Sequence, residues 1–239
     1  MLPKTVGVIQ ARLGSTRLPG KVLMELGSHT VVERMYKSLQ KCTRLDEVIF
    51  AIPDSKAEDT LANFLSEKGF SFFRGSLNNL VQRHLDAAAY VNAEIIVRVP
   101  GDNPFVDAQE VDRVVSLHLK HNRHGFTSNL SPFGKSKYPD GIGAEVFEVT
   151  TLENYTKGKG GEFLEHIHSN FLDYCSGRQI ENAVRVISPR CPWFKRCKNL
   201  KLDINTFEDL IFLRRLVAEL GEFPTSQEIV KWYNLTIAR

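Results

Sequence analysis

The sequence predicts an α/β fold with a mostly parallel central sheet flanked by helices. Short apolar runs alternate with longer amphipathic segments along the 239 residues, as they do where strands are followed by crossover helices. The apolar runs have the length of strands, and the amphipathic segments space their apolar residues by three and four. With 42% hydrophobic and 25% charged residues, the composition is that of an ordinary globular protein.

The first half of the chain repeats this alternation regularly. Residues 5–11 (TVGVIQA) form an apolar run that predicts a buried strand. Within residues 30–42, the apolar positions 31, 32, 35, 36 and 39 share one face, which predicts a helix. By the same criteria we expect further strands at residues 48–52, 70–74 and 94–99, and further helices at residues 56–68 and 78–91.

The second half of the chain is less regular. We expect Asp107 to cap a helix over residues 107–120 and Thr206 to cap one over residues 206–220, since both side chains accept hydrogen bonds from a first helical turn. Shorter elements complete this half. We expect strands at residues 125–129, 144–149, 183–187 and 201–204, and helices at residues 161–174 and 225–235.

No repeat, low-complexity tract or flexible linker divides the chain. We therefore expect a single domain over residues 1–239, with residues 125–180 as an inserted subregion. The net charge of +3 is small and its charges are interspersed, which argues against a nucleic-acid partner. No run approaches the about 18 apolar residues of a membrane span, so we expect no membrane partner either.

The cysteines and the first residues of the chain bear on the compartment. The four cysteines are scattered, and residues 1–14 lack the apolar core of a signal peptide. We therefore expect reduced thiols and a cytoplasmic location.

A basic loop directly follows the first predicted strand. It places Arg12, Arg17 and Lys21 around a turn that contains Gly14 and Gly20. Ligands of open α/β sheets bind at the carboxyl ends of the strands, and guanidinium and ammonium groups pair with phosphate oxygens. The loop therefore predicts a site for a polyanion, with a nucleoside triphosphate as the obvious candidate. It matches neither the P-loop nor the dinucleotide fingerprint. The alternative is a surface turn whose basic side chains are solvated.

Two further segments offer oxygen ligands for a hard cation such as Mg²⁺. Asp102 follows the predicted strand at residues 94–99, and Asp203 and Asn205 would lie on one face of the strand predicted at residues 201–204. A turn or N-cap aspartate is the alternative for Asp102.

The loop over residues 12–21, R-x-G-S-x-R-L-P-x-K, resembles the signature loop of sugar-activating cytidylyltransferases, the CMP-KDO and CMP-sialic acid synthetases. The preceding Ile9-Gln10-Ala11 makes it most similar to the branch called spore coat polysaccharide biosynthesis protein F. The similarity continues over most of the chain. It implies a Rossmann-like (GT-A-like) nucleotidyltransferase fold, CTP as donor, Mg²⁺ as cofactor and a homodimer.

The resemblance also implies roles for individual residues. The catalytic residues would be Arg12, Lys21 and Asp102. Nucleotide binding would involve Ala11, Arg12, Gly14, Ser15, Arg17, Lys21, Ser76, Arg83 and Asp102. The metal ligands would be Asp102, Asp203 and Asn205, where Asn205 stands at the second aspartate of the family's pattern. The subregion at residues 125–180 would bind the acceptor and form the dimer contact, with Tyr138, Asp140, Glu145, Glu165 and His166 as acceptor-binding residues.

Together these features predict a cytidylyltransferase that transfers CMP from CTP to an acidic sugar of the nonulosonate or KDO type, releasing pyrophosphate, for surface polysaccharide biosynthesis. Two alternatives remain open. One is a GT-A-like glycosyltransferase that consumes a nucleotide sugar, which has less use for a loop with three cations. The other is a non-catalytic nucleotide-binding protein of a polysaccharide pathway, which the replacement by Asn205 makes conceivable.

Overall fold

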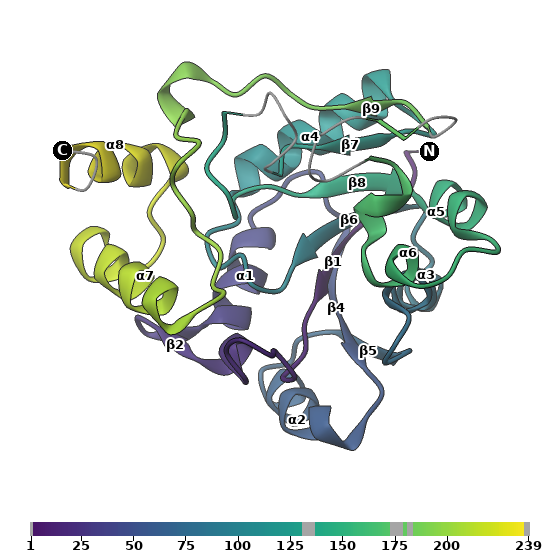
Figure 1. The fold of residues 1–239 in the computed structure, drawn as a ribbon, viewed down its shortest axis with the longest axis horizontal. Helices are drawn as coiled ribbons and strands as arrows, with labels where there is room; N and C mark the ends of the chain where they lie inside the picture. Colours follow the sequence, from purple (N-terminus) through teal and green to yellow (C-terminus); the bar gives the residue numbers. More distant parts are fainter. Residues whose placement is uncertain (1, 131–136, 173–178, 181–183, 237–239) are drawn as a thin grey trace.

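A computed structural model describes residues 2–130, 137–172, 179–180 and 184–236. In this part of the chain, strands from both halves of the sequence form one seven-stranded sheet of order β5-β4-β1-β6-β8-β7-β9 (Figure 1). The strands are β1 (Thr5–Gln10), β4 (Glu47–Pro53), β5 (Phe72–Gly75), β6 (Ile95–Pro100), β7 (Phe126–Ser128), β8 (Glu145–Glu148) and β9 (Val186–Ile187). A separate hairpin pairs β2 (Glu25–Leu26) with β3 (His29–Thr30).

The sheet is mostly parallel, as predicted. β1 lies at its centre between β4 and β6 and is parallel to both, and β5 extends the parallel part. β8 is antiparallel to β6 and to β7, whereas β7 and β9 are parallel. The carboxyl ends of β5, β4, β1 and β6 therefore meet at one edge, which brings the loops after β1 and β6 together.

Helices cover both faces of the sheet. They are α1 (Val31–Leu39), α2 (Asp59–Glu67), α3 (Leu80–Tyr90), α4 (Ala108–His121), α5 (Val149–Thr156), α6 (Glu162–Glu165), α7 (Phe207–Leu220) and α8 (Ser226–Thr236). Successive strand residues face opposite sides: Ile9 belongs to the core cluster that contains residues of α1, α2, α4 and α7, and Val8 belongs to the one that contains residues of α3 and α5. Figure 1 shows α3 and α5 together on one side of the molecule and α7 and α8 on the other.

The predicted caps are present. The Asp107 side chain accepts from the backbone N–H of Gln109, and Thr206 forms a capping box with Asp209. No helix in the described residues is long and apolar enough to cross a membrane.

Two predicted elements are wrong. In place of a helix over residues 161–174, the chain forms α6 and a 3₁₀ turn (Ile167–Asn170), separated by extended backbone at His166; residues 173 and 174 lie outside the described residues. The side chain of Asn170 donates to the carbonyls of Phe163 and Ile167, and Ile167 is buried in the core. The local side-chain hydrogen bonds of Asn170 compete with regular helical hydrogen bonding.

The second wrong element is the strand at residues 201–204. Leu202 and Ile204 are buried as a strand pattern would place them, but the segment makes only an isolated bridge between Lys201 and Asp140. The alternating burial correctly indicates an extended segment. The segment is not a strand because, in the described part of the chain, no neighbouring strand pairs with it over more than one residue. The strand predicted at residues 183–187 is found at β9, and residue 183 lies outside the described residues.

Candidate active site

The basic loop after β1 is folded back on itself and anchored. The backbone N–H of Leu13 donates to the buried carboxylate of Glu58 at 2.8 Å, and that of Gly20 donates to the Leu13 carbonyl at 2.9 Å. Gly20 has a φ of +72°, a conformation that favours glycine, and it leads into a 3₁₀ turn that begins at Lys21. The turn directs Lys21 into the protein.

Lys21 joins three segments of the chain. Its side chain is only 11% exposed, and its Nζ lies 2.9 Å from Asp102 Oδ2 and 2.5 Å from the carbonyl oxygen of Ile204. Asp102 follows β6, and Ile204 precedes Asn205. The fold therefore brings together the predicted phosphate loop and both predicted metal-ligand segments.

Gly101 determines how closely Asp102 approaches the end of β1. A Cβ atom at position 101 would lie 2.1 Å from the carbonyl oxygen of Gln10 and 3.2 Å from Ala11 Cα. Because both of these atoms belong to backbone, they cannot give way cheaply. Glycine at this position thus allows the loop after β6 to pack directly on the loop after β1.

Asn205 connects the third segment to the basic loop. Its amide oxygen accepts a hydrogen bond from Arg17 Nη2 at 2.5 Å, and its amide nitrogen donates to Asp203 Oδ2. Asp209 accepts from the backbone N–H groups of Asn205 and Thr206, each at 2.8 Å, and so stabilises the start of α7.

The carboxylates at this edge repel one another. Burial raises the pKa of Asp203, and the neighbouring Asp102 raises it further. Burial, together with Asp203 and Asp102, raises the pKa of Asp140 to about 6. Asp203 Oδ1 is also buried without a hydrogen-bond partner among the described residues. A bound cation would relieve both the repulsion and the unpaired oxygen.

The donor set suits a hard cation that keeps several non-protein ligands. No group of three or more His, Cys, Asp or Glu side chains is placed to hold a metal ion in the part of the chain that the structure describes. Asp102 and Asp203 would provide two carboxylates, with the Asn205 amide oxygen nearby. Mg²⁺ commonly binds through one or two carboxylates, with phosphate oxygens and water completing the shell.

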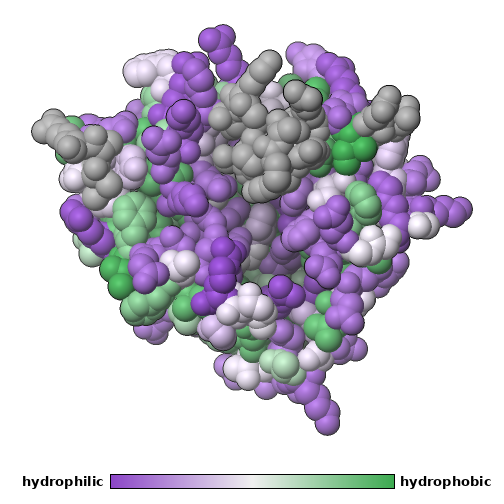
Figure 2. All heavy atoms as spheres, viewed as in Figure 1, coloured by the Kyte–Doolittle hydropathy of each residue, from purple (hydrophilic) through white to green (hydrophobic). Residues whose placement is uncertain are grey.

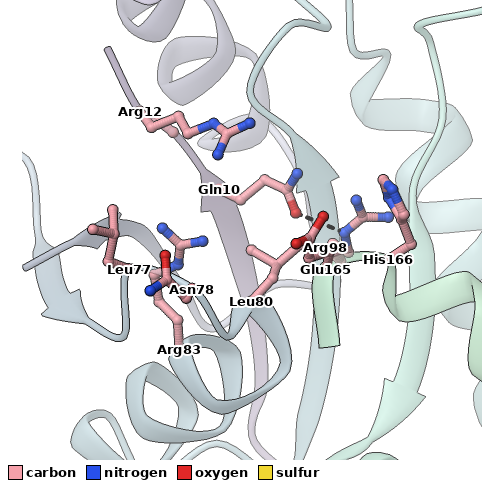
Figure 3. A pocket seen from close by; sticks show the side chains of 10 residues that line it. Gln10, Arg12, Leu77, Asn78, Leu80, Arg83, Arg98, Glu165 and His166 are labelled. Carbon is pink, nitrogen blue, oxygen red and sulfur yellow. Dashed lines mark hydrogen bonds between the residues drawn. The ribbon is translucent and has the colours of Figure 1, made fainter. Parts of the chain in front are cut away.

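A cavity of about 250 Å³ adjoins these groups at Gln10 and Ala11. Its lining comes from the end of β1, the residues before and within α3, strand β6, and α6 with the residue after it (Figure 3). Figure 2 shows the same side of the molecule as Figure 1, with a recess near its centre among hydrophilic side chains. Arg12, Arg83 and Arg98 all line the cavity, an arrangement that favours anionic ligands.

Arg83 is buried without an acidic partner. The residue is 5% exposed, and among the described residues its Nε has no hydrogen-bond partner and its guanidinium forms no ion pair. Burial and the nearby Arg12 lower the pKa of Arg83 to about 10, and the attraction of Glu58, which forms no ion pair with it, only partly opposes this shift. An unpaired buried cation is costly, so this arrangement favours an anionic ligand.

Arg98 is a cavity residue that the sequence analysis missed. It lies on β6 directly opposite Glu145 on β8, and its Nη1 donates to Glu145 Oε2 at 2.6 Å. Its Nε donates to Gln10 Oε1 at 2.8 Å (Figure 3). The available signal was an arginine inside the otherwise apolar run at residues 95–99.

The five predicted acceptor residues are spread over several environments. Glu165 and His166 line the cavity, and Glu145 lies behind Arg98. Asp140 lies near Asp203, outside the cavity lining. Tyr138 is fully buried and its hydroxyl accepts from Arg113 Nη1 at 2.9 Å, so it is placed in the core and away from the cavity.

The small residues that were predicted to bind nucleotide do not all lie at the cavity. Ala11 lines the cavity, whereas Gly14, Ser15 and Ser76 do not. The Ser15 hydroxyl accepts from the N–H of Leu18 at 3.3 Å, and that of Ser76 accepts from the N–H of Asn79 at 3.1 Å. These two hydroxyls therefore have local roles, in the basic loop and in the turn before α3.

Comparison with known proteins adds independent information. A family model described as cytidylyltransferase matches residues 6–168. The spore coat polysaccharide biosynthesis protein SpsF of Bacillus subtilis is 30% identical over 95% of this chain and 92% of its own.

Two solved structures share the fold. A cytidylyltransferase from Leptospira borgpetersenii superposes with a TM-score of 0.86 at 28% identity, covering 99% of this chain and 96% of that one. A CMP:2-keto-3-deoxy-manno-octonic acid synthetase complexed with CTP superposes with a TM-score of 0.62 at 17% identity, covering 90% of this chain and 99% of that one.

Proposed function

The chain belongs to the cytidylyltransferase family, and we propose that it transfers CMP from CTP to an acidic sugar, releasing pyrophosphate, in the biosynthesis of a surface polysaccharide. One observation carries the proposal furthest: Lys21 of the basic loop contacts both segments that bear the candidate metal carboxylates. Phosphoryl transfer depends mainly on positioning and charge stabilisation, and this convergence can provide both. The enzyme would work as a cytoplasmic homodimer.

CTP is the proposed donor. Arg12, Arg17 and Lys21 would hold the triphosphate, and the unpaired Arg83 would contribute a fourth cation from the side of α3. The similar synthetase that was solved with CTP supports this choice of nucleotide. The proposed reaction is attack of an acceptor oxygen on the α-phosphorus with loss of pyrophosphate, so no side-chain nucleophile is needed.

Asp102, Asp203 and Asn205 would hold Mg²⁺. When bound, the ion would neutralise phosphate charge and polarise the α-phosphate. Lys21 and Arg12 would stabilise the charge that develops on the departing pyrophosphate, which makes them, with Asp102, the proposed catalytic residues. The buried, unpaired oxygen of Asp203 supports this placement of the metal.

The donor half is tested by calorimetry with CTP, UTP, ATP and GTP, each with and without Mg²⁺. We expect selective, Mg²⁺-dependent binding of CTP that is weakened in Lys21→Met, while the exposed Lys37→Met on α1 behaves as the wild type. Indifference to all four triphosphates would contradict the proposal.

The reaction is then tested by pyrophosphate release with a panel of sugar acids. Pyrophosphate that appears only with both CTP and an acceptor would support nucleotidyl transfer. Release of a nucleoside diphosphate from a nucleotide sugar, without pyrophosphate, would instead identify a glycosyltransferase. CTP binding without turnover of any acceptor would favour a non-catalytic role.

A further inference from the structure

The cavity has two chemically different ends (Figure 3). At one end, Arg12 from the basic loop and Arg83 from α3 provide cations that have no acidic partner among the described residues. At the other end lie Arg98, Glu165 and His166. Gln10 lies between the two ends and is hydrogen-bonded to Arg98.

The guanidinium of Arg98 is held in a fixed orientation. Its side chain and that of Glu145 are almost completely buried, 5% and 2% exposed as residues. Gln10 accepts from Nε and Glu145 accepts from Nη1, so two of its three nitrogens are occupied. The second oxygen of Glu145 lies 3.8 Å from Nδ1 of His168. Arg98 Nη2 makes no hydrogen bond to the described residues, and the residue lines the cavity.

The two ends of the cavity differ in charge and therefore suit different ligands. Glu145 already neutralises most of the charge of Arg98, so this end suits a single negative charge better than a triphosphate. The carboxylate of Glu165 is exposed, so water screens its charge, and it would accept hydrogen bonds from hydroxyl groups. His166 adds a polar ring that can donate or accept. One guanidinium edge beside two groups that bind hydroxyls matches a polyhydroxylated carboxylate.

We propose that Arg98 determines acceptor specificity by binding the carboxylate of the acceptor sugar, with Gln10 and Glu145 as positioning residues that fix its guanidinium. This inference rests on the proposed function, in which Arg12, Arg17, Lys21 and Arg83 bind the donor CTP. Nη2 is the donor that faces the carboxylate, and Glu165 and His166 bind sugar hydroxyls beside it.

The test replaces both members of the buried Arg98–Glu145 ion pair at once, so that neither charge is left without its partner. In the double variant Arg98→Gln/Glu145→Gln, two amides replace the ion pair, which avoids leaving one buried charge alone. The matched control is Lys4→Gln/Glu47→Gln, which removes an ion pair at the amino ends of β1 and β4, away from the cavity. Melting temperatures of all three proteins establish that they are folded.

Two measurements are made on each protein. Calorimetry measures CTP binding in Mg²⁺. Pyrophosphate release gives kcat/KM for 3-deoxy-manno-octulosonate and N-acetylneuraminate, each offered as the free acid and as its primary amide. The amide has nearly the size of the carboxylate but carries no charge.

We expect the wild type and the control to prefer an acid over its amide by roughly 10- to 100-fold, the range for a hydrogen bond between charged groups. The Arg98/Glu145 double variant should lose this preference, mainly through KM for the acid, while its affinity for CTP stays within about threefold of the wild type. A merely structural role would lower the rates for acid and amide together and leave their ratio unchanged.

Several outcomes would overturn the inference. The first is a preference for the acid that persists in the double variant. The second is a loss of CTP affinity in the double variant that is as large as its loss of turnover. The third is wild-type protein that binds CTP but uses acid and amide equally, or uses neither. These results leave the proposed donor half standing. Wild-type protein that binds no CTP would refute the proposed function and this inference with it.

Discussion

Lys21 Nζ lies 2.9 Å from Asp102 Oδ2, which joins the loop after β1 to the loop after β6. The two residues are 81 positions apart in the sequence, and the parallel pairing of β1 with β6 brings them together. Lys21 thus places a positive charge directly beside the carboxylate of Asp102. This pair organises the proposed site before any ligand binds.

Replacing Lys21 should sharply reduce turnover while the fold survives. Met has a similar length and can fill the same buried space, so we expect Lys21→Met to fold, with a melting temperature somewhat below that of the wild type because Asp102 and the Ile204 carbonyl lose their donor. Loss of its charge should lower kcat by about 100- to 1000-fold, as for other removed stabilisers of transition-state charge. Steady-state pyrophosphate release measures this effect, and a wild-type rate would remove Lys21 from the mechanism.

Gly101→Ala should impair both stability and activity. Its new Cβ would meet the Gln10 carbonyl at 2.1 Å, so the loop that carries Asp102 must move away from β1. We expect a loss of about 1 to 3 kcal/mol in the free energy of unfolding, together with reduced kcat. Gly160→Ala is the control, because nothing lies within 4 Å of the place that a Cβ atom would take there. Equal urea unfolding curves for both variants would contradict this account of Gly101.

Asp203→Asn should separate stability from metal binding. Burial and Asp102 raise the pKa of Asp203, so its ionised form is unfavourable in the folded protein without a cation. The neutral amide should therefore raise the melting temperature in chelator by about 2 to 4 °C. It should also weaken the further stabilisation that Mg²⁺ and CTP give the wild type together. Thermal melts with and without these ligands test both effects, and an unchanged response to Mg²⁺ would exclude Asp203 as a ligand.

Glu148→Gln should destabilise the protein in a pH-dependent way. Burial alone would raise the pKa of Glu148, but hydrogen bonds from His118, His124 and Arg123 lower it to about 2. A lowered folded-state pKa contributes stability above the unfolded-state value of 4.5, and this stability is lost as the pH falls towards 2. The shift corresponds to about 3 kcal/mol at neutral pH. Urea unfolding between pH 3 and 7 should show a difference from wild type that is constant above about pH 5 and shrinks below it; a pH-independent difference would contradict this.

The regular part of the fold could be predicted from the sequence because local patterns there agree with the tertiary structure. The apolar run at residues 5–11 became β1, and Asp107 and Thr206 cap the helices that they were expected to cap. The segment at residues 161–174 failed because Asn170 and Ile167 make contacts that compete with helical geometry. The burial of Ile167 depends on the rest of the fold, and the side-chain hydrogen bonds of Asn170 leave no periodic pattern in the sequence.

Some residues of the candidate site could be predicted from the sequence and others could not, for a related reason. Arg12, Arg17 and Lys21 stand within one short loop, so their spacing alone indicates an anion site. Arg98 could have been suspected as a charge inside an apolar strand, but its partners Gln10 and Glu145 are 88 and 47 positions away. No spacing rule connects these three residues.

The sequence by itself determined the parallel α/β architecture, the basic loop after the first strand and the positions of the candidate carboxylates, because each depends on neighbouring residues or on short-range periodicity. Only the tertiary structure decided that Lys21 meets Asp102, that Arg83 is buried without an acidic partner among the described residues, and that Tyr138 lies in the core. These outcomes depend on strand order and on which side chains are desolvated together. Both are properties of the assembled sheet and its packed helices.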